Sequence, residues 1–467
     1  MLQSLRNIWD VPDLRKRIFF TLGLLAVYRL GNVIPTPGIN AAALIEFFEQ
    51  NRGNWFGLVD MFSGGNLAKV TIFALGIMPY ISSSIILQLL TVVWPFLEKL
   101  SKEGELGRRK ITQYTRYGTI ALSIVQGLGI AVFLEGQTVS GAQRIVEHPG
   151  FAFKFMTVLT LTTGTAFIMW LGEQITERGI GNGMSLIIFA GIVVGFPRAA
   201  IDTFRKLQSG ELSLFTAILL AAMMVFVIAA IIFVERGQRR ITVQYAKRVV
   251  GRRMYGGQST HLPLRVNTSG VIPVIFASSI IAFPQTIADM FKSQLPWLES
   301  VSNNLRWGMP LYNLLYVTFI IFFCYFYTAI VFNPDDVAEN MRKYGGFIPG
   351  IRPGKRTAEY LEHILDRITF GGAIYLALIA LLPEFLMAGF RVAPIPVVGP
   401  WLDNFFTQNG LGWITEGLHL SFFFGGTSLL IVVGVAMDTV AQIEAQLIMR
   451  HYDGFTGKGG RRIRGRR

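Results

Sequence analysis

Residues 72–94 read IFALGIMPYISSSIILQLLTVVW and residues 270–290 read GVIPVIFASSIIAFPQTIADM. Each stretch is long and apolar enough to cross a membrane as a helix, yet each contains proline, adjacent serines and a glutamine. Close packing between membrane helices explains the serines, but it explains less well why an amide and prolines occur in the same helices. A moderately apolar helix suits a boundary with lipid that opens and admits water. We therefore expect a functional seam at these two segments.

Ten apolar segments recur along the chain, which has 467 residues and 52% hydrophobic residues. Their runs are continuous rather than alternating, so they favour helices over a membrane barrel. The predicted fold is an all-α polytopic membrane protein. The ten segments are residues 18–34, 72–94, 118–134, 151–171, 183–201, 212–234, 270–290, 311–332, 368–388 and 422–440.

The two unusual segments are the second and the seventh, which are corresponding places in two sets of five. Paired irregular helices in matching positions are typical of internal repeats with the working site between them. Because five is odd, the two sets are expected to be inverted relative to each other. This predicts an N-terminal half at 1–201, an external hinge loop at 202–211 and a C-terminal half at 212–467.

Positive charge is distributed unevenly between the two sides of the predicted membrane. Of the 43 Lys and Arg, 32 fall on one side and 9 on the other. The positive-inside rule makes the rich side cytoplasmic, and it places both termini and a basic C-terminal tail there. In any single loop, such charges can act only as signals that set the orientation of the chain in the membrane.

Two cytoplasmic loops, residues 235–269 and 333–367, are too long and too uniformly basic for topology alone. Residues 235–253 read ERGQRRITVQYAKRVVGRR, in which arginine nearly alternates with Tyr, Val and Ile. This alternation predicts a short hairpin of strands that projects from the bilayer. We therefore interpret both loops as docking arms.

Residues 54–70, NWFGLVDMFSGGNLAKV, are apolar but too short and too glycine-broken to cross a membrane. They predict either a re-entrant segment or an amphipathic helix on the outer surface, and the residues alone do not choose between them.

Motifs for chemistry are missing from the sequence. It has no phosphate-binding GxxxxGK[ST] loop, no HExxH or GxSxG motif, scattered histidines and a single cysteine. No metal site and no cofactor are therefore predicted. Coupled carriers need ionisable groups within their spans, and few occur here. This favours a passive conduit over a small-solute carrier, with a purely structural scaffold as a third class. Mid-span isoleucines could form a constriction, although each alone is typical of ordinary packing.

Six long stretches make the chain resemble the SecY/Sec61-alpha family of protein-conducting channels. They are MFSGGNLAKVTIFALGIMPYISSSIILQLLTVV (61–93), KEGELGRRKITQYTRYGT (102–119), MWLGEQITERGIGNGMSLIIFAGIV (169–193), VERGQRRITVQYAKR (234–248), FNPDDVAENMRKYGGFIPGIRPG (332–354) and FGGTSLLIVVG (424–434). The resemblance implies ten helices in two inverted halves with a short re-entrant plug helix. It implies a passive path for unfolded secretory proteins, and lateral release of membrane segments into lipid.

The resemblance also implies partners and a location. The partners are SecE and SecG in the membrane, the SecA ATPase, the ribosome with its RNA, and preproteins with signal sequences, with SecDF and YidC as further candidates. The implied location is the bacterial inner membrane.

Site residues follow from the resemblance position by position. The pore ring falls on Ile77, Ile81, Ile188, Ile275, Ile287 and Ile431. The plug falls on Met61, Phe62, Ser63, Gly64 and Gly65, within about 55–70. The lateral gate falls on Ser82, Gln88 and Phe283. Docking of SecA or the ribosome falls on Arg239, Arg240, Lys247, Arg248, Arg252, Arg253 and Arg352. One departure is the long external loop 389–421, for which an interfacial segment and a solvated loop remain open.

Overall fold

A computed structural model of the chain describes most of its residues. They are 11–40, 43–44, 65–67, 69–136, 138–139, 143–210, 213–245, 248–250, 253–255, 259–291, 296–305, 309–388, 408 and 426–455. The long loop 389–421, apart from residue 408, and the end of the basic tail lie outside the described residues.

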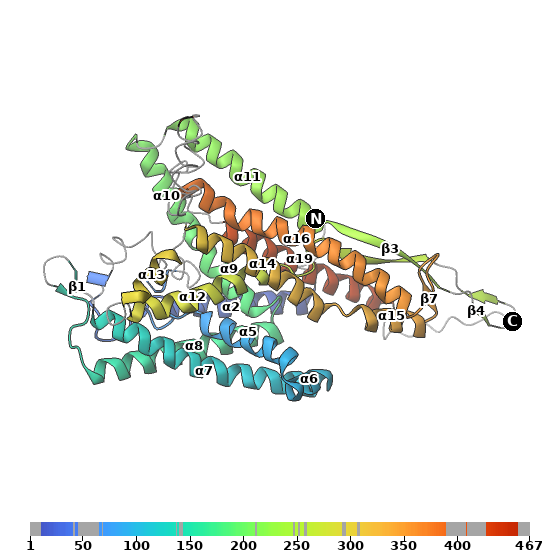
Figure 1. Cartoon of the computed structure of the whole chain (residues 1–467), viewed down its shortest axis with the longest axis horizontal. Helices are drawn as coiled ribbons and strands as arrows, with labels where there is room; N and C mark the ends of the chain where they lie inside the picture. The colour runs from blue at the N-terminus through green and yellow to red at the C-terminus, as the bar shows by residue number, and fades with distance from the viewer. Residues whose placement is uncertain are drawn as a thin grey trace. The chain divides into compact units, whose positions relative to one another are not determined.

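Each of the ten apolar segments contains a helix, so the prediction of an all-α polytopic membrane protein is confirmed (Figure 1). By length and composition alone, seven described helices can cross a membrane, or eight if the bent pair α5 and α6 (Pro95–Lys102) counts as one span. The ten helices are α2 (Pro12–Gly31), α5 (Met78–Val93), α7 (Glu105–Glu135), α8 (Phe151–Arg178), α9 (Gly183–Val193), α11 (Leu214–Arg236), α12 (Ile272–Phe291), α14 (Pro310–Val331), α16 (Lys355–Ala388) and α19 (Gly426–Phe455).

The chain divides into two compact units. Unit 1 comprises Met1–Gly195 and Val435–Arg467, and unit 2 comprises Phe196–Gly434. The first boundary follows a break at Val194, after which helix α10 (Gly195–Gln208) begins. Most of the segment expected to be a hinge loop, 202–211, is therefore helical. Residues 201–208, IDTFRKLQ, contain neither proline nor glycine, so nothing in them breaks the helix before Gln208.

In unit 1, α7 and α8 lie side by side, and α5 packs against α7 (Figure 1). The helices approach closely where a residue lacks a side chain. At Gly127 of α7, an added Cβ would lie 3.6 Å from the Cα of Val158 on α8. Small residues at such contacts let membrane helices pack backbone to backbone. A short hairpin of β1 (Thr138–Val139) and β2 (Gln143–Arg144) connects the two helices.

Residues 69–76 run through the interior of unit 1 as a series of turns. Thr71 forms a β-bridge with Pro35, and the amide of Ile72 donates to the carbonyl of Ile34 at 3.0 Å. Val70 has φ = 37°, which a helix does not contain. The plug helix expected to reach residue 70 therefore does not include the described residues 65–67, 69 and 70.

In unit 2, α14 packs against both α12 and α16, and a small sheet lies beyond the helix ends (Figure 1). The sheet has the order β6–β3–β7, with β3 (Gln238–Tyr245) antiparallel to both β6 (Ser259–Arg265) and β7 (Gly346–Phe347). The first arm thus contains a hairpin, as predicted, but the strand that pairs with β3 is β6, which lies beyond residues 235–253. A second hairpin, β4 (Arg248–Val250) with β5 (Arg253–Tyr255), extends from its tip. Unit 2 also contains α11, most of α10, α13 (Pro296–Asn304) and α15 (Pro334–Lys343).

Candidate functional site

The two predicted docking arms form one folded body. Strand β3 belongs to the first arm and β7 to the second, and they pair through Gln244 opposite Phe347 and Tyr245 opposite Gly346. We call β3, β6, β7, α15 and residues 355–368 of α16 the arm platform.

A small hydrophobic core holds the arm platform together. Its buried members come from β3, β6, the segment after β7 and the first turns of α16: Ile241, Leu264, Ile348, Leu361 and Ile364. Alternation along β3 buries Ile241, which belongs to this core, and Val243, while Arg240, Thr242 and Gln244 are exposed. The strand pattern that identified the hairpin is therefore the pattern that builds the core.

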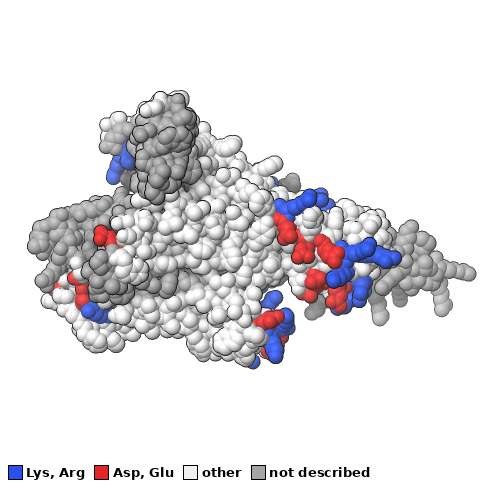
Figure 2. Space-filling view, in the orientation of Figure 1, with Lys and Arg blue, Asp and Glu red and all other residues white. Residues whose placement is uncertain are grey.

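The opposite face of the sheet is basic and polar. Arg240 lies across from Pro263, and Thr242 lies across from His261 in the register of β3 and β6, and all four residues are exposed. Arg239 is also exposed, beside the core face. Figure 2 shows Lys, Arg, Asp and Glu gathered over the end of unit 2 that holds α15 and β7.

The two arms differ in charge. Residues 235–269 contain eight Lys and Arg against one acidic residue, whereas residues 333–367 contain six of each sign. The excess of positive charge on the arm platform therefore belongs to the first arm. A polyanion such as RNA is attracted to that arm, whereas the second arm suits a protein surface of mixed charge.

The structure presents Arg352 from a tight loop. Gly350 and Gly354 flank it with φ of 82° and 108°, which L-residues with a side chain rarely adopt. The carbonyl of Arg352 accepts from the Thr357 Oγ1 at 2.9 Å, and the Ile351 amide donates to the Ile348 carbonyl at 3.1 Å. The backbone is fixed on the platform core while the guanidinium remains exposed.

The remaining docking residues lie on the β4–β5 hairpin and its loops. Arg248 begins β4 and Arg253 begins β5, but their side chains lie outside what the structure describes. Lys247 and Arg252 lie outside the described residues altogether.

The predicted gate residues of α5 have different surroundings. The serine that anchors this helix is Ser83, which is buried and donates to the Thr115 carbonyl of α7 at 2.9 Å. Gly118 makes room for it, since a Cβ there would lie 2.4 Å from the Ser83 Oγ. Ser82 is half-buried, and Gln88 donates only along its own helix, to Ser84 at 3.3 Å. The close-packing explanation thus holds for Ser83.

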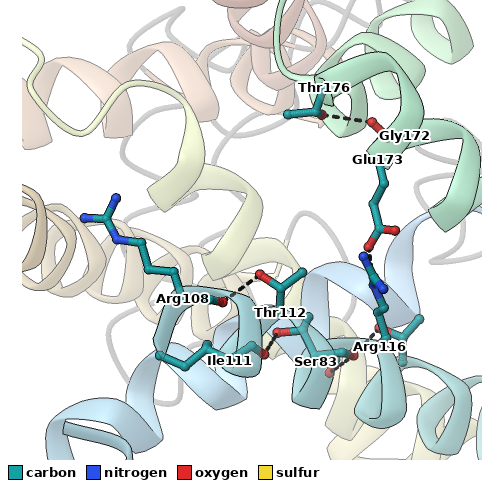
Figure 3. A network of polar contacts seen from close by, with 10 residues as sticks. Ser83, Arg108, Ile111, Thr112, Arg116, Gly172, Glu173 and Thr176 are labelled. Atoms are coloured by element: carbon teal, nitrogen blue, oxygen red, sulfur yellow. Dashed lines mark hydrogen bonds and ion pairs between the residues drawn. The ribbon is translucent and has the colours of Figure 1, made fainter. Parts of the chain in front are cut away.

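An ion pair braces α7 to α8 and was not predicted from the sequence. The Arg116 Nε donates to the Glu173 Oε1 at 2.7 Å, and the two side chains are 44% and 17% exposed (Figure 3). One turn along α8, Thr176 donates to the Gly172 carbonyl and accepts from the Gly183 amide at 2.9 Å. Arg116 and Glu173 are 57 residues apart, so no local spacing signals the pair.

The second helix of the predicted gate, α12, carries Pro284 in its interior and buries Ser279 and Gln285. Ser278 donates to the Ile275 carbonyl at 2.9 Å. Phe283 lies in this helix, but its side chain lies outside the description.

The isoleucines of the predicted pore ring are divided between the units. Unit 1 contains Ile77, Ile81 and Ile188, and unit 2 contains Ile275, Ile287 and Ile431. All are buried or half-buried, except Ile287, whose side chain the structure does not describe. The ring stays a prediction.

A buried polar cluster includes Asn66, near the end of the predicted plug segment at about 55–70. Met61, Phe62, Ser63 and Gly64 lie outside the described residues, while Gly65 is described with φ = 81°. Next to it, the Asn66 amide donates to the Tyr28 hydroxyl at 3.5 Å. With the Asn32 amide assigned to satisfy its neighbours, its oxygen accepts from the Asn66 amide at 3.3 Å and from the Arg29 guanidinium at 3.0 Å.

This cluster ties α2 to the segment around Asn66 and Phe73. Asn32 and Asn66 are 5% and 1% exposed, and the Tyr28 ring stacks on the Phe73 ring at 5.8 Å. Gly31 permits the contact, because a Cβ there would collide with the Phe73 ring. Among the described residues, no group of His, Cys, Asp and Glu is placed to hold a metal ion.

Comparison with known proteins agrees with this architecture. The SecY family profile matches residues 71–440. The protein translocase subunit SecY of Escherichia coli K12 is 51% identical over 457 residues, which cover 97% of this chain and 96% of that protein. The same subunit from Aquifex aeolicus is 44% identical over 456 residues, covering 97% of this chain and 99% of that one.

A solved protein-conducting channel superimposes with a TM-score of 0.61 at 16% identity, covering 92% of each chain, which supports the fold. The extent and identity of these matches, together with the ten helices and the two arms, show that the chain belongs to the SecY family.

Proposed function

We propose that this chain is the central pore-forming subunit of a protein-conducting channel. It is a passive conduit for unfolded secretory proteins, and it releases transmembrane segments sideways into lipid. One observation carries the proposal: 51% identity to a protein translocase subunit across 97% of the chain. The chain is not itself an enzyme, and SecA with ATP or a translating ribosome supplies the driving force.

The proposed partners fit the charges of the arm platform. The first arm attracts ribosomal RNA through its basic residues, and the exposed Arg352 loop on the second arm contacts SecA. Ribosome-bound channels occur among the solved structures of similar fold. SecE and SecG complete the membrane complex, and SecDF and YidC are further candidate partners.

The proposed location is the bacterial inner membrane, with both termini in the cytoplasm. The positive-inside distribution supports this orientation because the arm platform then lies on the same side as the ribosome and the motor.

The proposed path combines a ring, a plug and a gate. The isoleucine ring closes around a passing chain without offering it a hydrogen bond or a charge, and it limits ion leakage by dewetting. The plug at about 55–70 blocks the resting pore. The gate between the second and seventh spans uses Ser82, Gln88 and Phe283, and it exposes a partly polar seam to lipid.

A reconstitution experiment tests the proposed function. Liposomes containing this chain with SecE are supplied with SecA, ATP and a radiolabelled preprotein, and imported protein is scored by protease protection. We expect import that depends on both SecA and ATP. Saturable, ion-coupled uptake of a small solute by the purified chain would instead indicate a carrier. No import with SecA present would indicate a scaffold.

A further inference from the structure

The turn that leads from the first arm back into the membrane has a buried polar interior. It comprises residues 266–270, between the end of β6 and the start of α12. The Val266 amide donates to the Gly237 carbonyl at 2.9 Å and closes the mouth of the hairpin. Asn267 and Ser269 are 4% and 5% exposed, although the turn has the composition of a surface loop.

One side chain in this turn joins the turn to the end of α11 and also holds the turn itself together. The Asn267 Nδ2 donates to the Glu235 Oε1 at 2.6 Å and to the Gly270 carbonyl at 3.1 Å. Its Oδ1 accepts from the Ser269 Oγ at 3.2 Å. Glu235 lies in the last turn of α11, and Gly270 lies two residues before α12. We call these four residues the Asn267 junction.

The Asn267 junction is packed against two further membrane helices. Ser269 neighbours the buried Cys324 of α14. At Gly372 of α16, an added Cβ would lie 2.9 Å from the Val266 carbonyl oxygen, so the helix touches the turn directly. The turn therefore has little space in which to move independently of the helices.

Gly270 is the weak point of the connection between the arm platform and α12. Its φ of 62° and its lack of a side chain give the backbone freedom to bend there. The Asn267 bond to its carbonyl removes that freedom, and the charge-assisted bond to Glu235 fixes Asn267 in turn. Without these bonds, a displacement of the platform would be absorbed by the turn.

We infer that Asn267 is a positioning residue that transmits movement of the arm platform to α12. This inference rests on the proposed function, in which α12 forms one side of the lateral gate and a motor ATPase pulls on the platform. The junction makes the six-residue connection 266–271 stiff, so that work done on the platform reaches the helix.

The test measures coupling rather than activity alone. Proteoliposomes with the complete channel complex, the motor ATPase and a preprotein are assayed for ATP hydrolysed and for protein imported. We expect Asn267→Ala to retain motor binding and preprotein-stimulated ATP hydrolysis. Imported protein per ATP is expected to fall by roughly fivefold or more, the lower range of ordinary coupling free energies.

Two matched variants accompany it. Glu235→Gln keeps the oxygen that accepts from Asn267 and is expected to retain most of the coupling, whereas Glu235→Ala is expected to lose it. Thr268→Ala removes only a hydrogen bond to the Arg265 carbonyl in the same turn, and it is expected to match the wild type. Cys324 is the only cysteine and is buried, so its resistance to a maleimide reports intact packing.

Each outcome decides the inference. Equal losses of ATP hydrolysis and import in Asn267→Ala would mean that the residue is merely structural, and would overturn it. Unchanged import per ATP would overturn it as well. If Asn267→Ala does not fold, imported protein per ATP is compared between Glu235→Ala and Glu235→Gln. Equal values for these two variants would overturn the inference. Absence of import by the wild type would overturn the proposed function itself, and the coupling with it.

Discussion

At the scale of single residues, the structure separates side chains that look alike in the sequence. Ser82, Ser83 and Ser84 form one triplet, yet only Ser83 reaches across to α7. Likewise, Asn66 resembles any polar residue at the end of a glycine-rich loop, but it is buried between Tyr28 and Asn32. The sequence predicted a role for the polar residues of the second span. It could not predict which side chains form hydrogen bonds to other helices, because their partners lie 32 to 38 residues away.

The Asn66 cluster gives a first prediction. Asn66→Ala leaves the buried Tyr28 hydroxyl and Asn32 amide with fewer hydrogen bonds, which costs about 1–3 kcal/mol. We expect a lower melting temperature of the purified protein in detergent, measured by thermal unfolding. Lys69→Ala is the control, because Lys69 is exposed in the same segment. Equal melting temperatures of the two variants would contradict a stabilising role for the cluster.

The Arg352 loop gives a second prediction. Arg352→Glu reverses an exposed charge without disturbing Gly350, Gly354 or the bond to Thr357, so folding is expected to be normal. Preprotein import driven by SecA is expected to stop, because the proposed contact requires a cation. Lys355→Glu, an exposed change just beyond the loop, is expected to keep most of the import. Normal import by Arg352→Glu would rule out the role.

At the scale of elements, the sequence predicted structure that arises within one element better than it predicted pairing between distant segments. The ten apolar runs and the alternation in residues 238–245 predicted the helices and the first hairpin, because both signals lie within a single element. The pairing of β7 with β3 joins segments about a hundred residues apart, and no periodicity reports it. The Arg116–Glu173 pair escaped prediction for the same reason.

The arm platform gives a third prediction, which concerns its core. Leu361 is fully buried there, and Leu361→Ala is expected to cost about 2–5 kcal/mol through lost contacts and a cavity. The sheet would loosen while the membrane helices stay folded. We expect faster cleavage of both arms by protease and weaker co-sedimentation with ribosomes.

Glu362→Ala is the control for this variant, since Glu362 is exposed on the adjacent position of α16. Cleavage of the first arm alone would show that the two arms fold separately, contrary to the shared sheet.

At the scale of the whole molecule, charge and apolar surface are segregated. Charged side chains gather on the arm platform, and the described spans contain few of them (Figure 2). A passive conduit needs this arrangement, because the surface that binds the motor or the ribosome must lie outside the path of the passing chain. The positive-inside count anticipated the division, but the difference in charge between the two arms emerged only when acidic residues were counted as well.

The proposed pore gives a fourth prediction at this scale. Ile81→Ser combined with Ile275→Ser replaces aliphatic groups by hydroxyls and is expected to wet the constriction. Ion conductance of the reconstituted complex in planar bilayers should rise above that of the wild type. Ile86→Ser, on an exposed face of α5, is the control. Unchanged conductance, with the plug also deleted, would count against the ring.

The shared sheet also sets an order of events during synthesis. Strand β7 and the first turns of α16 follow α14 in the chain, so the platform core lacks Ile348 and Leu361 until ribosomes have translated past them. A chain arrested earlier exposes a β3 edge that has no second neighbour, and it cannot complete the surface on which a motor would act. The arm platform is therefore complete only after Leu361 and Ile364 have been synthesised.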